Sequence, residues 1–271
     1  MRDAPLWPAA DRRRQDAAPD VLIVVPVLDE AEALPALLAE LGALGLLERT
    51  LFVDNGSTDG GVDLIGAAGG EVIREPRRGY GYPCLTGARE AAARGAQVVV
   101  FMEADGTDDP AQVRRLSGPV FAGVADLVIG ERRAAVRPRN RAAGRVSPAG
   151  AEPTPSPVGR MPFHQRLGND WLALSLRLLF GLRLTDDGPF RAVRLDLLER
   201  LRLEERAYAF PTEMLVKAHL AGARIAVRET RYRPRAGRSK IAGTARGTLG
   251  AVRDITWCLV RLRLRGLHAG D

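Results

Sequence analysis

Val98-Val-Val-Phe-Met-Glu-Ala-Asp-Gly106 is the stretch that decides the fold. Its first five residues are apolar and mostly β-branched, which predicts a buried strand. Glu103 and Asp105 follow at once, and two carboxylates one residue apart just beyond a strand can share a hard cation that neutralises a phosphate-bearing ligand. The alternative is a loop or a helix cap, which is how we interpret Asp108-Asp109-Pro110 just downstream. The stretch therefore predicts a strand that ends in an acidic site.

The same arrangement occurs twice upstream. An apolar run over residues 21–25 closes at Pro26 and leads to Glu30, and a second run over 51–53 leads to Asp54. In a parallel sheet the carboxyl ends of the strands meet at one edge, where ligands bind. We therefore expect these polar residues to lie close together around one site.

The rest of the chain continues an alternation of strands and helices, with a repeat of roughly 25 residues that is typical of βαβ units. Further strands are predicted over 71–73, 126–129 and 225–232. Helices are predicted over 31–47, 58–68, 82–94, 110–116, 164–182, 190–202, 211–221 and 244–265. The fold class is therefore α/β, with a mostly parallel central sheet flanked by helices.

Composition narrows the range of partners. The 271 residues carry a formal charge of +7, and from Arg224 onward twelve Lys or Arg face three Asp or Glu. Such a basic stretch favours phosphates, an acidic membrane surface or nucleic acid, and the alternative is a solvated face. Interleaved aromatic residues, which a nucleic-acid binder would use, are lacking, so no nucleic-acid partner is expected. Cys84 and Cys258 fit neither a metal spacing nor a disulfide framework, which favours a reducing cytoplasm.

The chain divides into three parts. Residues 1–19 are expected to be a disordered tail without the apolar core of a secretory signal. Residues 20–243 form the main domain, in which 133–160 is an Arg- and Pro-rich stretch that we interpret as a mobile loop. Residues 244–271 form a C-terminal amphipathic helix, whose apolar stripe and arginines suit either contact with a membrane surface or core packing. No apolar run approaches the roughly 18 residues of a spanning helix.

Several motifs, in order along the chain, resemble the glycosyltransferase family 2 group with the GT-A fold, a Rossmann-like nucleotide-binding fold. Within it the chain looks like the polyprenyl-phosphate sugar synthases of the dolichyl-phosphate mannose or glucose type. The resemblance covers about residues 21 to 255. The motifs are VVPVLDE at 24–30, FVDNGSTDG at 52–60, REPRRGYG at 74–81, EADGTDDP at 103–110, ADLVIGERR at 125–133, TDDGPFRAV at 185–193, FPTEM at 210–214 and RPRAGRSKI at 233–241.

The resemblance implies a role for each matching residue. The nucleotide would be held by Pro26, Val27, Glu30, Asp54, Ser57, Arg77, Arg78, Gly79 and Ala104. Mg²⁺ or Mn²⁺ would be bound by Glu103 and Asp105, and the catalytic residues would be Asp105, Arg132, Asp186 and Asp187. The phosphate or acceptor would be bound by Arg191, Arg235, Arg238, Ser239 and Lys240. Two positions depart from the family pattern: Glu103 replaces the usual Asp, and Thr107 replaces a frequent Gln. Ser57 has a helix cap as its alternative.

These residues predict an inverting transfer of a sugar from a UDP- or GDP-sugar donor. A polyprenyl phosphate acceptor is already anionic and needs no base, whereas a hydroxyl acceptor would need Asp186 or Asp187. The enzyme is expected in the cytoplasm, with peripheral contact to the inner face of the membrane. Alternatives are a soluble transferase acting on a small-molecule hydroxyl and a catalytically silent nucleotide-binding module. A sugar-1-phosphate nucleotidyltransferase is disfavoured because no Gly-rich signature follows the first strand.

Overall fold

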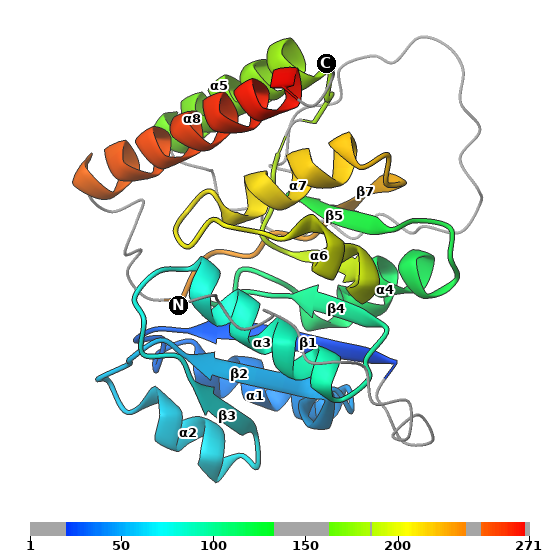
Figure 1. Ribbon diagram of the computed structural model, residues 1–271. Helices are drawn as coiled ribbons and strands as arrows, with labels where there is room; N and C mark the ends of the chain where they lie inside the picture. Colours follow the sequence, from blue (N-terminus) through cyan, green and yellow to red (C-terminus); the bar gives the residue numbers. More distant parts are fainter. Residues whose placement is uncertain (1–19, 133–162, 185, 237–244, 269–271) are drawn as a thin grey trace, which may run out of the picture.

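A seven-stranded sheet forms the centre of the molecule (Figure 1). The computed structural model describes residues 20–132, 163–184, 186–236 and 245–268. The predictions for the tail 1–19, the loop 133–160 and the basic residues Arg238, Ser239 and Lys240 lie outside the described residues. The strands are β1 (Val21–Val27), β2 (Thr50–Asp54), β3 (Glu71–Arg74), β4 (Val98–Phe101), β5 (Leu127–Arg132), β6 (Arg191–Arg194) and β7 (Ile225–Thr230).

The strand order is β3-β2-β1-β4-β6-β5-β7, and every pairing is parallel except those of β6. β6 runs antiparallel to β4 and β5, with Arg194 opposite Val98 and Val193 opposite Leu127. The helix predicted over 190–202 is therefore wrong in its first turn, because residues 191–194 are a strand and only 195–201 are helical. Hydrogen bonding to two distant strands overrides the local helical pattern.

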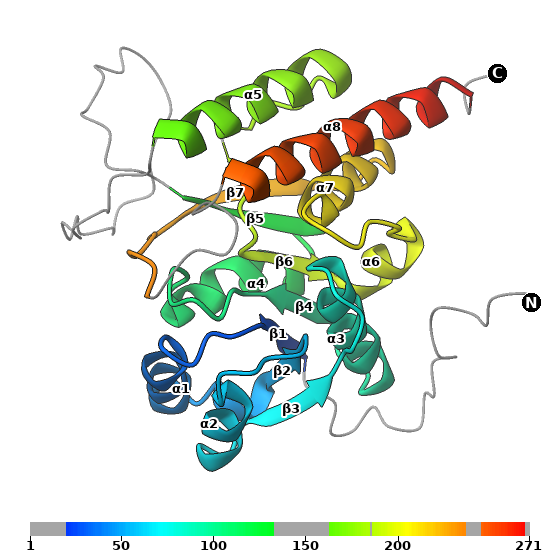
Figure 2. The ribbon, with the colours of Figure 1, turned by 90° about the vertical axis from the view of Figure 1, so that its left-hand side faces the viewer.

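Helices cover both faces of the sheet (Figure 2). They are α1 (Leu34–Ala43), α2 (Gly61–Ala67), α3 (Gly81–Ala93), α4 (Val113–Phe121), α5 (Phe163–Phe180), α6 (Leu195–Leu201), α7 (Phe210–Leu220) and α8 (Ala245–His268), with 3-10 turns at Leu47–Arg49 and Pro110–Gln112. Leucines of α1 and apolar residues of α4 bury one face, and α3, α6 and α7 bury the other. Because β1 is covered on both sides, its residues form a continuous apolar run instead of an alternating one.

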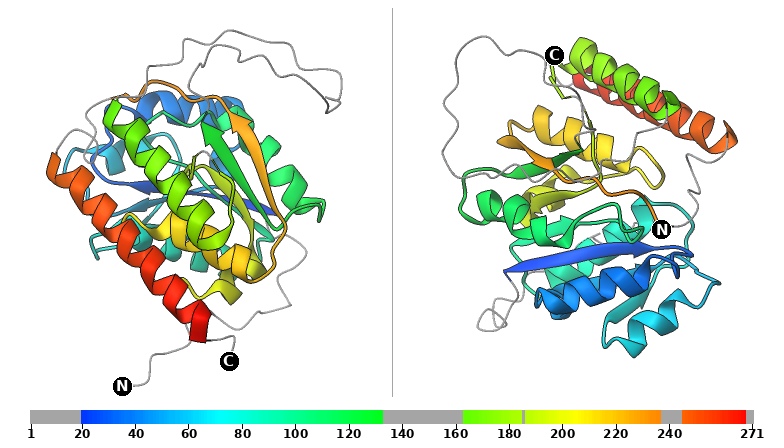
Figure 3. Two further views of the ribbon diagram at one scale, coloured as in Figure 1. Left: turned by 90° about the horizontal axis from the view of Figure 1, so that it is seen from above. Right: turned by 180° about the vertical axis from the view of Figure 1, so that it is seen from behind.

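The helices α5 and α8 form an outer layer beyond α7 (Figure 3). Cys258, Leu259 and Leu262 of α8 and Leu176 of α5 are buried in the same cluster as the face of the sheet beneath them. Within the described residues, no helix is both long and apolar enough to span a bilayer. The outer layer is thus packed on the domain through its inner face.

Candidate active site

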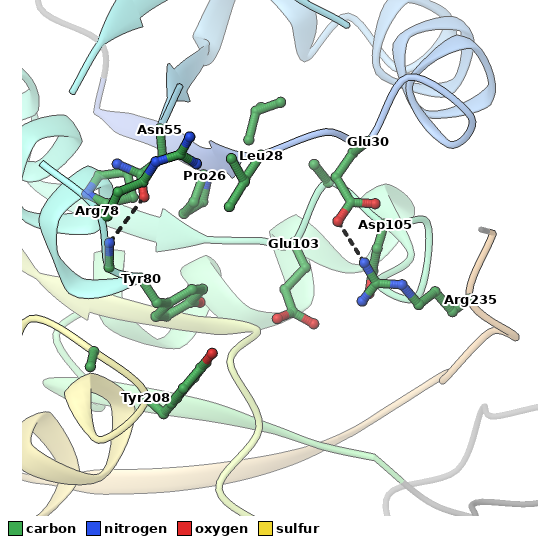
Figure 4. A pocket seen from close by; sticks show the side chains of 15 residues that line it. Pro26, Leu28, Glu30, Asn55, Arg78, Tyr80, Glu103, Asp105, Tyr208 and Arg235 are labelled. Carbon is green, nitrogen blue, oxygen red and sulfur yellow. Dashed lines mark hydrogen bonds and ion pairs between the residues drawn. The ribbon is translucent and has the colours of Figure 1, made fainter. Parts of the chain in front are cut away.

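A cavity of about 380 Å³ opens at the carboxyl ends of β1, β2 and β4 (Figure 4). Nine predicted residues line it, namely Pro26, Val27, Glu30, Arg78, Gly79, Glu103, Ala104, Asp105 and Arg235. The remaining wall is made by residues that the sequence did not single out as site residues, namely Leu28, Asn55, Tyr80, Pro83, Ala207 and Tyr208. The strand ends thus bring the motifs at 24–30 and 103–110 together, as the parallel arrangement requires.

Asp105 is a buried carboxylate of the cavity wall, with 4% of its surface exposed. Its Oδ1 accepts hydrogen bonds from the backbone N–H and the hydroxyl of Thr107, at 3.0 and 2.7 Å. Its Oδ2 accepts one from Nη1 of Arg235 at 2.8 Å, and Nη2 of the same guanidinium reaches Oε1 of Glu30 at 2.5 Å. Arg235 therefore bridges two carboxylates at the cavity wall, as Figure 4 shows for Glu30.

Two further carboxyl groups accumulate beside Asp105. Burial, together with the nearby charge of Asp105, raises the pKa of Asp108 to about 7, although a hydrogen bond from the backbone N–H of Glu103 at 2.9 Å opposes the shift. The pKa of Glu103 is raised well above its ordinary value, chiefly because the carboxyl is buried and also because Asp105 and Asp108 lie nearby. Asp109 is the predicted cap, since it accepts from the backbone of Ala111 at 3.1 Å. The crowding of acids disfavours negative charge unless a cation is present.

The donor set suits a divalent ion that arrives with a phosphate-bearing ligand. Mg²⁺ is usually bound by one or two carboxylates together with phosphate oxygens and water, and Glu103 and Asp105 both face the cavity. Among the described residues, no group of three or more His, Cys, Asp or Glu is arranged to hold an ion. An ion at this position would therefore need the phosphate oxygens of a bound molecule, or water, to complete its coordination.

Asn55 organises the wall opposite the acids. It is 4% exposed, and its Nδ2 donates to the carbonyls of Glu75 and Arg77 at 2.8 and 2.7 Å. Its Oδ1 accepts from the backbone N–H of Gly79 at 3.2 Å. Gly79 has φ 134°, and a Cβ there would lie 2.3 Å from the carbonyl oxygen of Arg206, so only glycine fits. One amide side chain just after β2 thus fixes residues 75–79, the segment that follows β3.

Within the motif at 52–60, Asn55 lines the cavity, whereas Asp54 and Ser57 lie beside it. Asp54 accepts from the backbone N–H of Ser57 at 2.8 Å, and the Ser57 hydroxyl accepts from the backbone N–H of Asp29 at 3.0 Å. Asp54 and Ser57 line a neighbouring hollow. The structure thus ties the loop after β2 to the loop after β1.

Arg77 and Arg78 point to different surroundings. Arg77 donates to Glu75 through Nε and Nη2 at 2.8 and 2.6 Å, and these hydrogen bonds lower the pKa of Glu75 to about 2. Its guanidinium also lies 4.7 Å from the ring centre of Tyr82. Arg78 lines the cavity and has no ion-pair partner among the residues that the structure describes. Arg78 is therefore a cation of the cavity wall that no carboxylate neutralises in the described part of the chain.

Arg132 and Asp186 form a fork at the ends of β5 and the segment before β6. Oδ2 of Asp186 accepts from the backbone N–H and Nε of Arg132 at 3.0 and 2.8 Å, and Oδ1 accepts from Nη2 at 2.8 Å. Asn169 of α5 donates to the same Oδ1 at 3.3 Å. The Arg132 guanidinium lies 5.5 Å from the ring centre of Tyr232. All four acceptor positions of the carboxylate are thus in use.

Asp187 is engaged in the same way. Its Oδ1 accepts from Nη2 of Arg191 at 2.9 Å, and its Oδ2 accepts from the hydroxyl of Thr212 at 2.8 Å. The Arg191 side chain is 1% exposed and also donates to the carbonyl of Pro211 at 2.8 Å. Arg191 therefore lies inside the protein, joining β6 to the start of α7, and away from the cavity wall.

The far wall of the cavity is connected to the outer helix layer. Ala207 and Tyr208 come from the segment between α6 and α7, and the neighbouring Arg206 carbonyl accepts from the backbone N–H of Gly81 at 3.0 Å. The fully buried Glu213 accepts from the backbone N–H groups of residues 204 and 205 at 2.9 and 2.7 Å. Arg261 of α8 reaches Glu205 at 2.5 Å. This segment thus contacts both the cavity and α8.

An α/β fold with a cavity at the carboxyl edge of its sheet defines the class of protein that binds a ligand at the strand ends. The chain belongs to glycosyl transferase family 2, whose family model matches residues 22–201. It is 33% identical over 237 residues to an uncharacterised glycosyltransferase of Mycobacterium tuberculosis, covering 86% of this chain and 95% of that protein. It is 31% identical over 264 residues to the undecaprenyl-phosphate mannosyltransferase of Micrococcus luteus, covering 92% and 98%.

Solved structures support the fold independently. Glucosyl-3-phosphoglycerate synthase from Mycobacterium tuberculosis, crystallised with Mn²⁺, UDP-glucose and phosphoglyceric acid, superimposes with a TM-score of 0.64 at 20% identity, covering 92% of this chain and 81% of that chain. The predicted GT-A fold and the predicted family are therefore confirmed. The individual site residues stay predictions, now with a defined position in the structure.

Proposed function

We propose that this glycosyltransferase moves a sugar from a UDP- or GDP-sugar to a polyprenyl phosphate, with inversion at the anomeric carbon. The observation that carries the proposal is that both candidate bases, Asp186 and Asp187, already accept hydrogen bonds from neighbouring side chains. Asp186 accepts four hydrogen bonds, three of them from Arg132, and Asp187 is held by Arg191 and Thr212. A hydroxyl acceptor needs a base that can take its proton, whereas a phosphate monoester is ionised near neutral pH.

The names of the relatives agree with a phosphate acceptor. The Micrococcus luteus relative is named an undecaprenyl-phosphate mannosyltransferase, and a second relative, 27% identical over 208 residues, is the polyprenol monophosphomannose synthase of Mycolicibacterium smegmatis. The alternative acceptor is a phosphorylated small molecule whose hydroxyl attacks the anomeric carbon, because the glucosyl-3-phosphoglycerate synthase of Mycolicibacterium smegmatis is 31% identical over 128 residues. The two acceptor classes differ in the atom that attacks.

The donor would occupy the cavity with its diphosphate toward the acids. Glu103 and Asp105 would hold Mg²⁺ or Mn²⁺ together with diphosphate oxygens, and the ion would neutralise charge on the departing nucleoside diphosphate. Arg78 would pair with the diphosphate because no carboxylate competes for it among the described residues. Asn55 would keep the 75–79 wall in place. Arg132, fixed by Asp186, would face the sugar or the acceptor phosphate.

The outer helix layer supports contact with a membrane surface. Trp257, Val260 and Leu264 follow one face of α8 at helical spacing and are 67%, 41% and 54% exposed, and Leu174 and Leu178 of α5 are 55% and 73% exposed. Exposed arginines flank this apolar stripe on α8, at positions 253, 263 and 265. A helix with an apolar face and cationic flanks binds anionic lipid surfaces. We expect Trp257→Glu to lower flotation with phosphatidylglycerol vesicles while phosphatidylcholine vesicles float little of either protein.

The acceptor class is tested with a matched pair of lipids. Radiolabelled UDP-glucose, UDP-GlcNAc and GDP-mannose are each incubated with the protein, Mn²⁺ and vesicles that contain either undecaprenyl phosphate or undecaprenol. One donor should label the phosphate lipid and leave the alcohol unlabelled. Label in undecaprenol, or in 3-phosphoglycerate supplied in place of the lipid, with none in undecaprenyl phosphate would contradict the proposal.

A further inference from the structure

The segment that carries Arg235 is fastened along the acidic motif by backbone contacts. Tyr232 forms a bridge with Asp108, the backbone N–H of Arg233 donates to the carbonyl of Thr107 at 3.0 Å, and that of Ala236 donates to the carbonyl of Asp105 at 3.1 Å. Residues 232–236 thus run beside 105–108. This pairing delivers the Arg235 guanidinium to the acids from a distant part of the sequence.

The Arg235 guanidinium already occupies one oxygen of Asp105, a carboxylate predicted to hold the divalent ion. Its two terminal nitrogens contact Oδ2 of Asp105 at 2.8 Å and Oε1 of Glu30 at 2.5 Å. The other oxygen of Asp105 is taken by Thr107. A divalent ion that bound to Oδ2 of Asp105 would therefore meet the positive charge of Arg235 at the same oxygen. Like charges a few ångströms apart repel each other in a partly buried site.

We propose that Arg235 is an exchange residue. It neutralises Asp105 and Glu30 while the donor is absent, and it transfers to the diphosphate when the donor and the divalent ion bind. Arg suits both states, because its planar fork matches carboxylate and phosphate oxygens alike. The inference rests on the metal-dependent part of the proposed function. It predicts that the ion alone binds weakly and that ion and nucleotide strengthen each other's binding.

The experiment measures Mn²⁺ binding to the free protein by electron paramagnetic resonance, which does not depend on transfer activity. Arg235→Gln should tighten Mn²⁺ binding about tenfold, or about 1.4 kcal/mol. The same variant should bind UDP or GDP, titrated in saturating Mn²⁺, less tightly than the wild type. Arg233→Gln is the matched control, since Arg233 lies on the same segment but pairs with Glu40 and Asp109. It should leave both affinities unchanged.

The opposite signs of the two changes distinguish exchange from a structural role, which would weaken both affinities together. Mn²⁺ binding that is unchanged or weaker in Arg235→Gln, but lost in Asp105→Asn, would overturn the exchange and leave the metal site in place. Mn²⁺ binding that Asp105→Asn does not alter would overturn the metal site itself, and the exchange with it. Circular dichroism of each variant checks that it is folded.

Discussion

Replacing Asp186 by Asn separates a positioning role from a catalytic one. Asn keeps one acceptor oxygen for the backbone N–H of Arg132, but it loses the charge and the second oxygen of the fork. Breaking a buried ion pair costs about 3–5 kcal/mol. The Arg132 side chain is 21% exposed and keeps its contact with the Tyr232 ring, so we expect a loss of about 2 kcal/mol of unfolding free energy. That corresponds to a fall in Tm of roughly 4–8 °C.

The activity of Asp186→Asn carries the mechanistic information. If Asp186 only positions Arg132, the rate of transfer falls but the pH profile keeps its shape. If Asp186 were a general base, the rate would fall about 10²- to 10⁴-fold and the loss of activity at low pH would disappear, because the group that protonates there is gone. Rates are measured from pH 5 to 9 with the acceptor that the lipid assay identifies.

Asp126→Asn is the matched control. Asp126 accepts a similar fork from Arg224, at 3.0 Å from Nε and 2.7 Å from Nη2, plus a backbone N–H at 2.8 Å, but it lies at the start of β5 and not on the cavity wall. It should lower Tm without changing the transfer rate at a temperature where the variant is folded. If Asp186→Asn, but not Asp126→Asn, no longer lost activity at low pH, the positioning role of Asp186 would be refuted and a hydroxyl acceptor would be indicated.

Three further outcomes follow from the site and the core. Asp105→Ala should lower the transfer rate at least about 100- to 1000-fold while the far-ultraviolet circular dichroism spectrum is unchanged, and an active variant would contradict the site. Asn55→Ala removes the three hydrogen bonds of a buried amide and should cost about 2–3 kcal/mol in urea unfolding and weaken nucleotide binding, whereas intact binding would show that the 75–79 wall is fixed by other contacts. The fork from Arg224 lowers the pKa of Asp126 from 3.8 to about 2, so the stability it gives is present above pH 3.8 and is lost as pH falls through about 2. The stability difference between wild type and Asp126→Asn should therefore close in acid, and a constant difference would exclude this linkage.

The strands of the sheet could be predicted wherever the strand's own residues form an apolar run. β1, β2 and β4 are apolar runs that end in polar residues, and each was placed within a few residues of its observed bounds. β6 could not be predicted in this way, because four residues, Arg191 to Arg194, precede leucines at helical spacing. Its strand conformation comes from the hydrogen bonds of β4 and β5 on either side. The partner strands lie about 60 to 90 residues away in the sequence, so the residues around position 192 do not reveal this pairing.

The site shows the same division. Glu30, Glu103 and Asp105 converge because strand ends meet, which the sequence predicts. Tyr208 reaches the cavity only because the segment between α6 and α7 folds back across it, and no periodicity indicates that. Asp108 resembles a cap next to Asp109, but burial and the Glu103 backbone take it into the acidic cluster. Asn55 had a visible signal, an Asn-Gly pair directly after a strand, yet its three hydrogen bonds depend on the loop that packs against it.

The contacts of α8 limit how the protein can be shortened. A chain truncated before residue 245, to remove the exposed apolar stripe and improve solubility, would also remove Cys258, Leu259 and Leu262 from the core. It would take Arg261 away from Glu205, in the same segment that supplies Ala207 and Tyr208 to the cavity. Solubility is therefore better sought by exchanging single outward residues such as Trp257 than by deletion, because the last helix supports the segment that forms part of the cavity wall.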